Sequence, residues 1–216
     1  MKHHSIDQVV LKHSNRWNVE FHMPSTDLMT KSPLGKCSEF YLERKEFADT
    51  KLKQDAQVLY IGLENVSKDT GEIVGNIYRK GKEIKSRAKV FQHGDILYSR
   101  LRPNLNKVLY WDKPESGICS TEFLVLTPNL ELTNGLFFRH LLASEIVQKQ
   151  ISRLITGAAL PRLLIDDFGS ILLPKVPAED ITEYTKEIGR LLKQRTDYIQ
   201  SIENLDAHLK RIVTDL

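Results

Sequence analysis

Two arginines and two asparagines stand at every second position of one short segment: Arg100, Arg102, Asn104 and Asn106. A guanidinium group can bind guanine or a phosphate through two hydrogen bonds, and a carboxamide can bind adenine in the same way. In an extended chain this spacing would place all four side chains on one side of the backbone. The segment is therefore predicted to contact DNA. The alternative for the asparagines is that they hydrogen-bond to the backbone of a local turn.

A basic block surrounds this segment. Between Arg79 and Lys107 the chain carries nine Lys or Arg residues and two acidic residues, although its net charge is only +3. Such a local excess favours a phosphate backbone as partner, with lysines contacting phosphates more than bases. The predicted DNA contacts are Tyr78, Arg79, Lys80, Lys82, Lys85, Arg87, Tyr98, Arg100, Arg102, Asn104, Asn106 and Lys107. The alternative is a solvated, lysine-rich loop.

Motifs that would carry catalysis are missing from the sequence. There is no glycine-rich phosphate loop and no methyltransferase cofactor motif, and the seven histidines lack metal-ligand spacing. Cys37 and Cys119 are too few for a disulfide framework and are expected to be reduced. We therefore predict a non-catalytic protein without cofactor or metal. The absence of a signal peptide or a long apolar stretch predicts a cytoplasmic protein that does not enter membranes.

Up to about Pro177 the sequence predicts a mixed structure of strands and helices. Residues 57–66 and the runs AKVF, DILYSR, NKVLYW and GICSTEFLVLTP are typical of strands separated by turns. Residues 67–87 are loop-like, with three glycines. A helix is expected over residues 135–154, capped by Asn134 and packed on the sheet through one face. This combination predicts an α+β fold with a small β-rich globular domain.

After Pro177 the sequence pattern changes to that of one long helix. Apolar residues recur seven apart in two complementary positions, with one exception, Arg195. These residues are predicted to form a coiled coil with another polypeptide. The predicted dimerisation residues are Ile181, Tyr184, Ile188, Leu191, Arg195, Tyr198, Ile202, Leu205, Leu209 and Ile212, and Leu216 continues the series. The alternative is a single amphipathic helix packed on its own domain. We reject it here because about 57 Å of helix would extend past a domain of this size.

Five strings in order give the chain a family resemblance. They are YIGLENV (60–66), GDILYSRLRPNLNKV (94–108), STEFLVLTP (120–128), TGAALPRL (156–163) and LLPKVP (172–177) before the heptad helix. This series resembles the DNA specificity (S) subunits of type I restriction-modification systems. The resemblance implies a lead-in over residues 1–33, a target recognition domain over 34–177 and one long helix over 178–216.

Specificity subunits of this family carry two recognition domains and two antiparallel helices, which together read a bipartite DNA target. The resemblance therefore implies that this chain pairs with a second copy or a related half-subunit, although a fragment of a longer subunit would look the same. It also implies that separate modification and restriction subunits carry catalysis. Two other functions stay open: a coiled-coil interaction adaptor, and the recognition fragment of a larger methyltransferase-nuclease.

Overall fold

The computed structural model of the chain describes residues 32–48, 55–155 and 160–214. Three sequence predictions lie mostly or wholly outside these residues: the lead-in over residues 1–33, the helix end at Gly157 and the heptad position Leu216. No helix within the described ranges is both long enough and apolar enough to cross a membrane.

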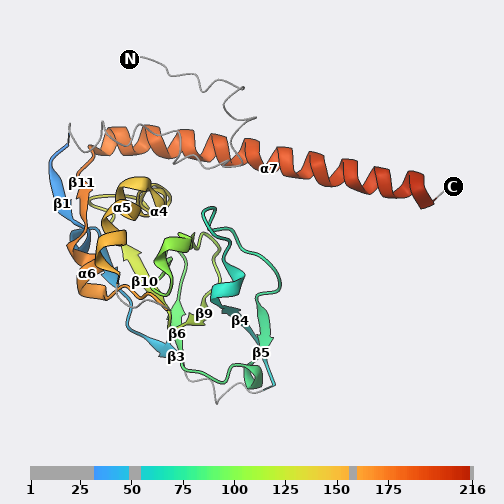
Figure 1. Ribbon diagram of the computed structural model, residues 1–216, viewed down its shortest axis with the longest axis horizontal. Helices are drawn as coiled ribbons and strands as arrows, with labels where there is room; N and C mark the ends of the chain where they lie inside the picture. Colours follow the sequence, from blue (N-terminus) through green and yellow to red (C-terminus); the bar gives the residue numbers. More distant parts are fainter. Residues whose placement is uncertain (1–31, 49–54, 156–159, 215–216) are drawn as a thin grey trace.

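A four-stranded antiparallel sheet lies at the centre of the globular part (Figure 1), in the order β2-β10-β7-β8. Its strands are β2 (Tyr41–Glu43), β7 (Ile96–Ser99), β8 (Val108–Tyr110) and β10 (Phe123–Pro128). Side chains of a strand alternate between the two faces of a sheet. In β7, Ile96 and Tyr98 belong to one core cluster and Leu97 to another. The central sheet is therefore covered on both faces.

A second sheet covers one of these faces, in the order β3-β6-β9-β4-β5. Its strands are β3 (Phe47–Ala48), β4 (Gln57–Ile61), β5 (Tyr78–Lys80), β6 (Ala88–Phe91) and β9 (Gly117–Ser120). Strands β4 and β9 are parallel, and the other neighbours are antiparallel. Phe91 and Trp111 meet edge to face in the core between the sheets, with ring centres 5.1 Å apart.

Three helices cover the other face: α4 (Gly135–Ala143), α5 (Glu145–Leu154) and α6 (Ile165–Ser170). The predicted cap is confirmed, because the Phe137 amide donates to Asn134 Oδ1 at 2.9 Å. The single helix expected over 135–154 is wrong. It breaks at Ser144, whose backbone is extended and whose hydroxyl donates to the Leu141 carbonyl at 2.7 Å. Serine side chains compete for backbone groups in this way.

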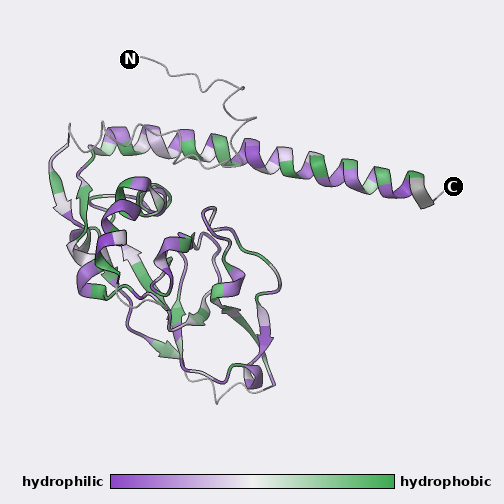
Figure 2. Cartoon of the chain, in the orientation of Figure 1, coloured by the Kyte–Doolittle hydropathy of each residue, from purple (hydrophilic) through white to green (hydrophobic). Residues whose placement is uncertain are grey.

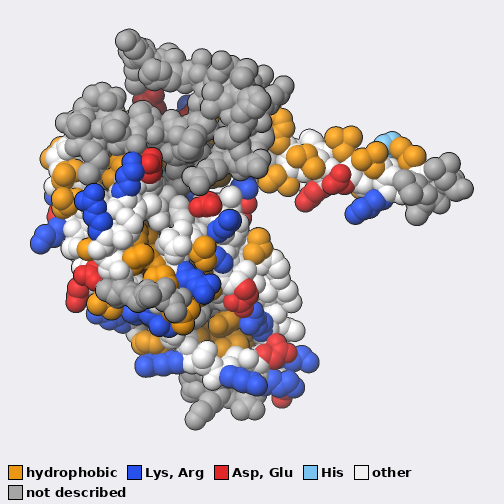
Figure 3. Space-filling view, viewed as in Figure 1, with side chains coloured by type: hydrophobic (Ala, Val, Ile, Leu, Met, Phe, Trp, Pro, Cys, Tyr) orange, Lys and Arg blue, Asp and Glu red, His pale blue; other side chains and the backbone are white. Residues whose placement is uncertain are grey.

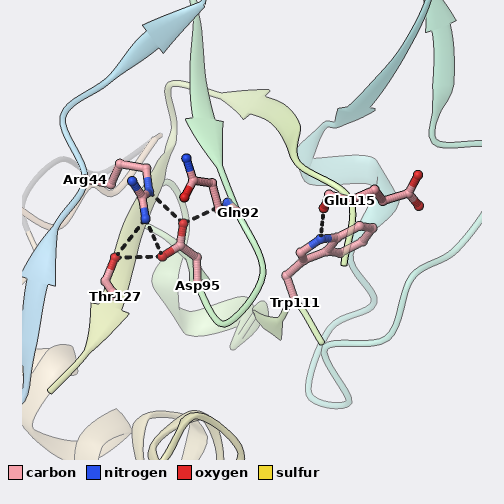
Figure 4. A network of polar contacts seen from close by, with 6 residues as sticks. All are labelled: Arg44, Gln92, Asp95, Trp111, Glu115 and Thr127. Atoms are coloured by element: carbon pink, nitrogen blue, oxygen red, sulfur yellow. Dashed lines mark hydrogen bonds and ion pairs between the residues drawn. The ribbon is translucent and has the colours of Figure 1, made fainter. Parts of the chain in front are cut away.

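A buried polar network joins the central strands (Figure 4). Arg44 Nε donates to Asp95 Oδ2 at 2.8 Å, and the Thr127 hydroxyl and the Gln92 amide also donate to this carboxylate. The Asp95 side chain is fully buried. A buried carboxylate is tolerated when a cation and further donors satisfy it, as they do here. The network fixes β2 and β10 to the turn that precedes β7.

The long helix α7 (Ala178–Thr214) follows a two-stranded sheet of β1 (Leu34–Lys36) and β11 (Leu172–Pro174). Its first half lies along the other helices, and its second half projects beyond the globular part (Figure 1). Tyr184 stacks on Phe137, with ring centres 5.9 Å apart, and Asn134 Nδ2 donates to Thr185 Oγ1 at 2.7 Å. Hydrophobic and hydrophilic residues alternate along the projecting part (Figure 2).

The structure confirms the predicted α+β class, with a β-rich globular part and one long C-terminal helix. Two details differ from the sequence prediction. The run over 117–128 forms two strands, β9 and β10, which belong to different sheets. The loop expected over 67–87 contains strand β5 and a 3-10 turn, η4 (Gly81–Glu83). Strands β1 to β3 were not predicted, because two or three residues give too little alternation to read.

Candidate nucleic-acid interface

Lysine and arginine side chains gather at the end of the globular part farthest from α7 (Figure 3). The exposed members of the predicted set in this region are Lys80, Lys82, Lys85 and Arg87, all on or next to β5 and η4. Lys82 forms an ion pair with Asp55, and Arg87 lies 3.4 Å above the centre of the Phe47 ring. Within the described part of the chain, no ion pair involves Lys80, Lys85 or Arg87. These three cations are available to an anionic partner.

Arg79 lies beside this region in a more confined setting. Its guanidinium stands 4.8 Å from the centre of the Tyr60 ring and pairs with Glu64. Burial alone would raise the pKa of Glu64, but hydrogen bonds from its own backbone amide and from Arg79 lower the pKa overall. The neighbouring Tyr78 is 45% exposed and donates its hydroxyl to Glu115 at 3.1 Å. Both predicted contacts are thus accessible, and each is held by a carboxylate.

The extended conformation predicted for residues 100–106 is wrong. Residues Pro103–Leu105 form a 3-10 turn, η5, and the residues on either side of it, Arg102 and Asn106, both have φ of 49°. Proline cannot continue a strand ladder, and a left-handed backbone reverses the chain. The side chains at 100, 102, 104 and 106 therefore do not share one side of a strand. Positive φ at an arginine is uncommon and is found more often at functional sites than elsewhere.

Three residues of the predicted DNA-contacting set have structural roles instead. Tyr98 is 1% exposed and packs on Phe168, with ring centres 4.7 Å apart. Asn106 is 6% exposed, donates to the Ala143 carbonyl at 2.8 Å and accepts from Gln148. Lys107 Nζ donates to the Leu63 carbonyl at 2.7 Å. Tyr98 and Asn106 are too deeply buried to reach a ligand, so we remove them from the candidate interface, and Lys107 is committed to the loop that carries Glu64.

Arg102 and Asn104 are exposed, and Arg100 is partly exposed. Their segment is anchored to the residues around Arg162. Leu101 and Arg162 form an antiparallel bridge, and the Arg102 amide donates to the Pro161 carbonyl at 2.8 Å. Arg162 itself donates two hydrogen bonds to Glu122, with Nη2–Oε1 at 2.9 Å and Nε–Oε2 at 3.3 Å. The described part of TGAALPRL therefore places a third arginine beside Arg100 and Arg102.

A short series of contacts connects Arg162 to Arg79 across the five-stranded sheet. The Glu122 amide donates to Ser120 Oγ at 3.2 Å, and Ser120 is next to Tyr60, over which Arg79 lies. Burial raises the pKa of Tyr60, and the face of its ring attracts the Arg79 guanidinium. The candidate interface thus runs from the basic end through Arg79 and Tyr60 to the group at Arg162. Sequence reasoning missed Tyr60, Glu64 and Glu122, because strand pairing brings them together.

The predicted dimerisation residues fall into two groups. Ile181 and Ile188 are 6% and 1% exposed and lie in the core with α4, while Tyr184 and Leu191 are partly buried. The expectation that α7 needs another chain along its whole length is therefore wrong for its first half. The second group lies on the projecting half of α7, which we call its open half, and consists of Tyr198, Ile202, Leu205, Leu209 and Ile212, which are 50–61% exposed. Between the two groups Arg195 pairs with Glu72, with Nη2–Oε2 at 2.7 Å.

No cluster of three or more His, Cys, Asp or Glu side chains suited to a metal ion occurs in the ranges that the structure describes. Burial raises the pKa of both Cys37 and Cys119, which disfavours the reactive thiolate form of these two side chains.

Comparisons with known proteins agree with the family resemblance. No protein-family model matches the chain. A curated relative, the specificity subunit of the type I restriction enzyme HindI from Haemophilus influenzae, is 25% identical over 150 residues. The match covers 63% of this chain and 32% of the relative. The chain is therefore similar to a type I specificity subunit and spans about a third of that protein's length.

Solved structures share the fold. The HsdS subunit from Thermoanaerobacter tengcongensis has a TM-score of 0.65 and 24% identity, with 82% of this chain and 45% of that chain covered. A chain from a structural study of complex assembly in the type I restriction-modification system has a TM-score of 0.64 and 24% identity, covering 84% and 47%. The S subunit of a type I restriction-modification system from M. genitalium has a TM-score of 0.52 and 15% identity, with 78% of this chain and 41% of that chain covered. The resemblance to type I specificity subunits is confirmed, and the shared fold is a globular part followed by one long helix.

Proposed function

We propose that this chain binds double-stranded DNA sequence-specifically and directs a type I restriction-modification complex to its target. The similarity to a specificity subunit over 150 residues carries the proposal. The candidate interface supports it independently, because exposed cations are held on a rigid framework of paired strands. Arginines can contact both bases and phosphates, whereas lysines contact phosphates more than bases.

One globular part supplies one recognition surface, whereas a bipartite target needs two. We propose that the open half of α7 pairs antiparallel with a second copy or a related half-subunit, and so places two recognition surfaces on one duplex. In a homodimer the two half-sites would be identical and inverted, because the two-fold axis of the protein is imposed on the DNA. Modification and restriction subunits would then bind this assembly and carry out the chemistry.

DNA binding is tested by selecting bound sequences from a random duplex pool and measuring their affinity at two salt concentrations. We expect one enriched bipartite sequence and an affinity that falls steeply with salt. The variants Arg100→Ala and Arg102→Ala should each lose on the order of 1–3 kcal/mol of binding free energy if these residues contact bases. Arg190→Ala is the matched control, since Arg190 is an exposed arginine on α7.

A second function, that of a protein-interaction adaptor, is favoured by the apolar residues on the projecting half of α7. The same selection separates the two functions. An adaptor would enrich no sequence, and its weak affinity for DNA would not respond to Arg100→Ala or Arg102→Ala. Retained affinity of both arginine variants for an enriched sequence would instead move base contact to another part of the interface.

A further inference from the structure

The backbone at Arg162 is held firmly in place. Arg162 bridges to Leu101, and the amide of the next residue, Leu163, donates to the Arg100 carbonyl at 2.9 Å. The Leu163 side chain is fully buried in the core beneath the helices. The position from which the Arg162 side chain extends is therefore set by the fold.

The ion pair made by that side chain is open to exchange. Arg162 and Glu122 are 44% and 27% exposed and meet through two parallel hydrogen bonds, the same fork that a phosphate accepts from arginine. An exposed pair of this kind is weak, because water and salt screen it. The contrast is Arg44 with Asp95, where the carboxylate is fully buried and two further donors, the Thr127 hydroxyl and the Gln92 amide, hold it.

The charges around the pair favour an incoming anion. Arg100 and Arg102 come from the segment that bridges to Arg162, and the Arg100 amide donates to the Glu122 carbonyl at 2.9 Å, so three arginines stand on the backbone segments next to Glu122. Arg100 Nε is buried and, among the described residues, has no hydrogen-bond partner. A local excess of positive charge attracts the phosphates of the DNA backbone.

We propose that Glu122 occupies, in the free protein, the position at Arg162 that a backbone phosphate takes in the complex. The proposal rests on the DNA-binding function above and adds a residue of the protein itself that limits the affinity for DNA. Phosphate must displace the carboxylate before Arg162 can contribute, so Glu122 lowers the sequence-independent part of the affinity. Glu64 likewise forms an exposed ion pair with Arg79, in the middle of the interface.

Glu122→Gln tests the exchange, because glutamine keeps the shape and removes the charge. Affinity for a random duplex is expected to rise about two- to fivefold, the worth of an exposed ion pair. The slope of log affinity against log salt should steepen by up to about 0.9, the value for one phosphate contact, because the wild type gains this contact only by losing the Arg162–Glu122 pair and the variant gains it outright. Glu183→Gln is the control: it removes one exposed carboxylate from α7 and should leave the slope unchanged. Thermal unfolding verifies that each variant is folded.

Dependence on Arg162 is the decisive measurement. In an Arg162→Gln background the gain from Glu122→Gln should disappear, since the freed partner is gone. A gain that persists there, or that Glu183→Gln reproduces, overturns the proposal and leaves only general charge repulsion. Salt elution from heparin, a polyanion other than DNA, separates the two hypotheses. If Glu122→Gln strengthens heparin binding only when Arg162 is present, and the protein does not bind duplex DNA, the exchange is supported and the DNA-binding function is refuted. If the protein binds duplex DNA but the gain does not depend on Arg162, the exchange is refuted and the DNA-binding function is supported.

Discussion

The two halves of α7 follow one heptad pattern in opposite surroundings. Ile181 and Ile188 are almost completely buried against the globular part, whereas Ile202 and Leu209, at the equivalent heptad positions, are both 58% exposed. The repeat therefore shows that one face of the helix is apolar along its length. It does not show what covers that face, which depends on the position of the other helices.

Arg195 marks the boundary between the halves. It stands at a heptad core position, yet it pairs with Glu72 on the loop after β4. That loop approaches the sheet closely: Gly71 has φ of 64°, and a Cβ there would lie 1.9 Å from the Val108 carbonyl oxygen. Only glycine fits both the conformation and the space. The fold thus delivers a fixed carboxylate to the point where α7 leaves the globular part.

The largest expected effect comes from the buried half. Ile188→Ala should lower the free energy of unfolding by about 2–5 kcal/mol, because it leaves a cavity among α7 and the helices beneath it. Ile202→Ala removes the same atoms from the open half and should change the stability of the globular part by less than about 0.5 kcal/mol. Urea unfolding of both variants, at a protein concentration low enough to prevent association, measures the difference. Equal losses would contradict the division of the helix.

The open half should govern self-association. Leu205→Lys places a charge in the proposed helix-helix contact twice per dimer and should weaken association on the order of 100-fold, as expected for losing one apolar contact per helix. Asn204→Lys adds the same charge on the neighbouring, polar position of the heptad. Sedimentation over a range of concentrations measures both variants. Similar association constants for the two would indicate that the apolar face does not hold the copies together.

The free energy of unfolding of the globular part, where α4 packs against α7, should decrease as the pH falls. Burial, reinforced by the charge of Arg139, lowers the pKa of His140 on α4 from 6.5 to about 3. The unfolded chain binds this proton below its ordinary pKa and the folded chain does not, so stability is complete above that value and decreases below it. Between neutral pH and roughly pH 5 the loss should reach about 2 kcal/mol. His140→Gln should remove this dependence in urea unfolding, whereas His208→Gln, on the exposed half of α7, should retain it.

Local sequence signals predicted the long helix, the cap at Asn134 and the central strands. Each of these depends on neighbouring residues: Pro177 before the helix, an asparagine before an apolar turn, and short β-branched or aromatic runs between turns. The same signals located the basic block. They did not separate its exposed members from its buried ones.

The failures concern contacts between distant residues. Asn106 is fixed by Ala143 and Gln148, about forty positions away, so its alternation with Asn104 had no bearing on its orientation. The alternation from Arg100 to Asn106 predicted an extended segment, whereas a 3-10 turn begins within it at Pro103. The heptad pattern likewise could not show that α4 already covers the first half of α7. In each case tertiary packing overrode a local periodicity.

The smallest expected effect sharpens the boundary itself. Arg195→Gln removes the ion pair with Glu72, whose two side chains are 21% and 47% exposed. Because the pair is exposed to water, the free energy of unfolding should fall by only about 0.2–1 kcal/mol, and by less at high salt. The helix should also open locally: amide exchange should quicken around residue 195 and stay unchanged around Ile188. Lys193→Gln removes one exposed charge a short distance away and provides the control.

Glu72→Gln should reproduce the effect of Arg195→Gln, and combining the two should add little, since each removes the same contact. Fully additive losses would mean that Arg195 and Glu72 act separately, and the departure of α7 from the globular part would then depend on packing alone.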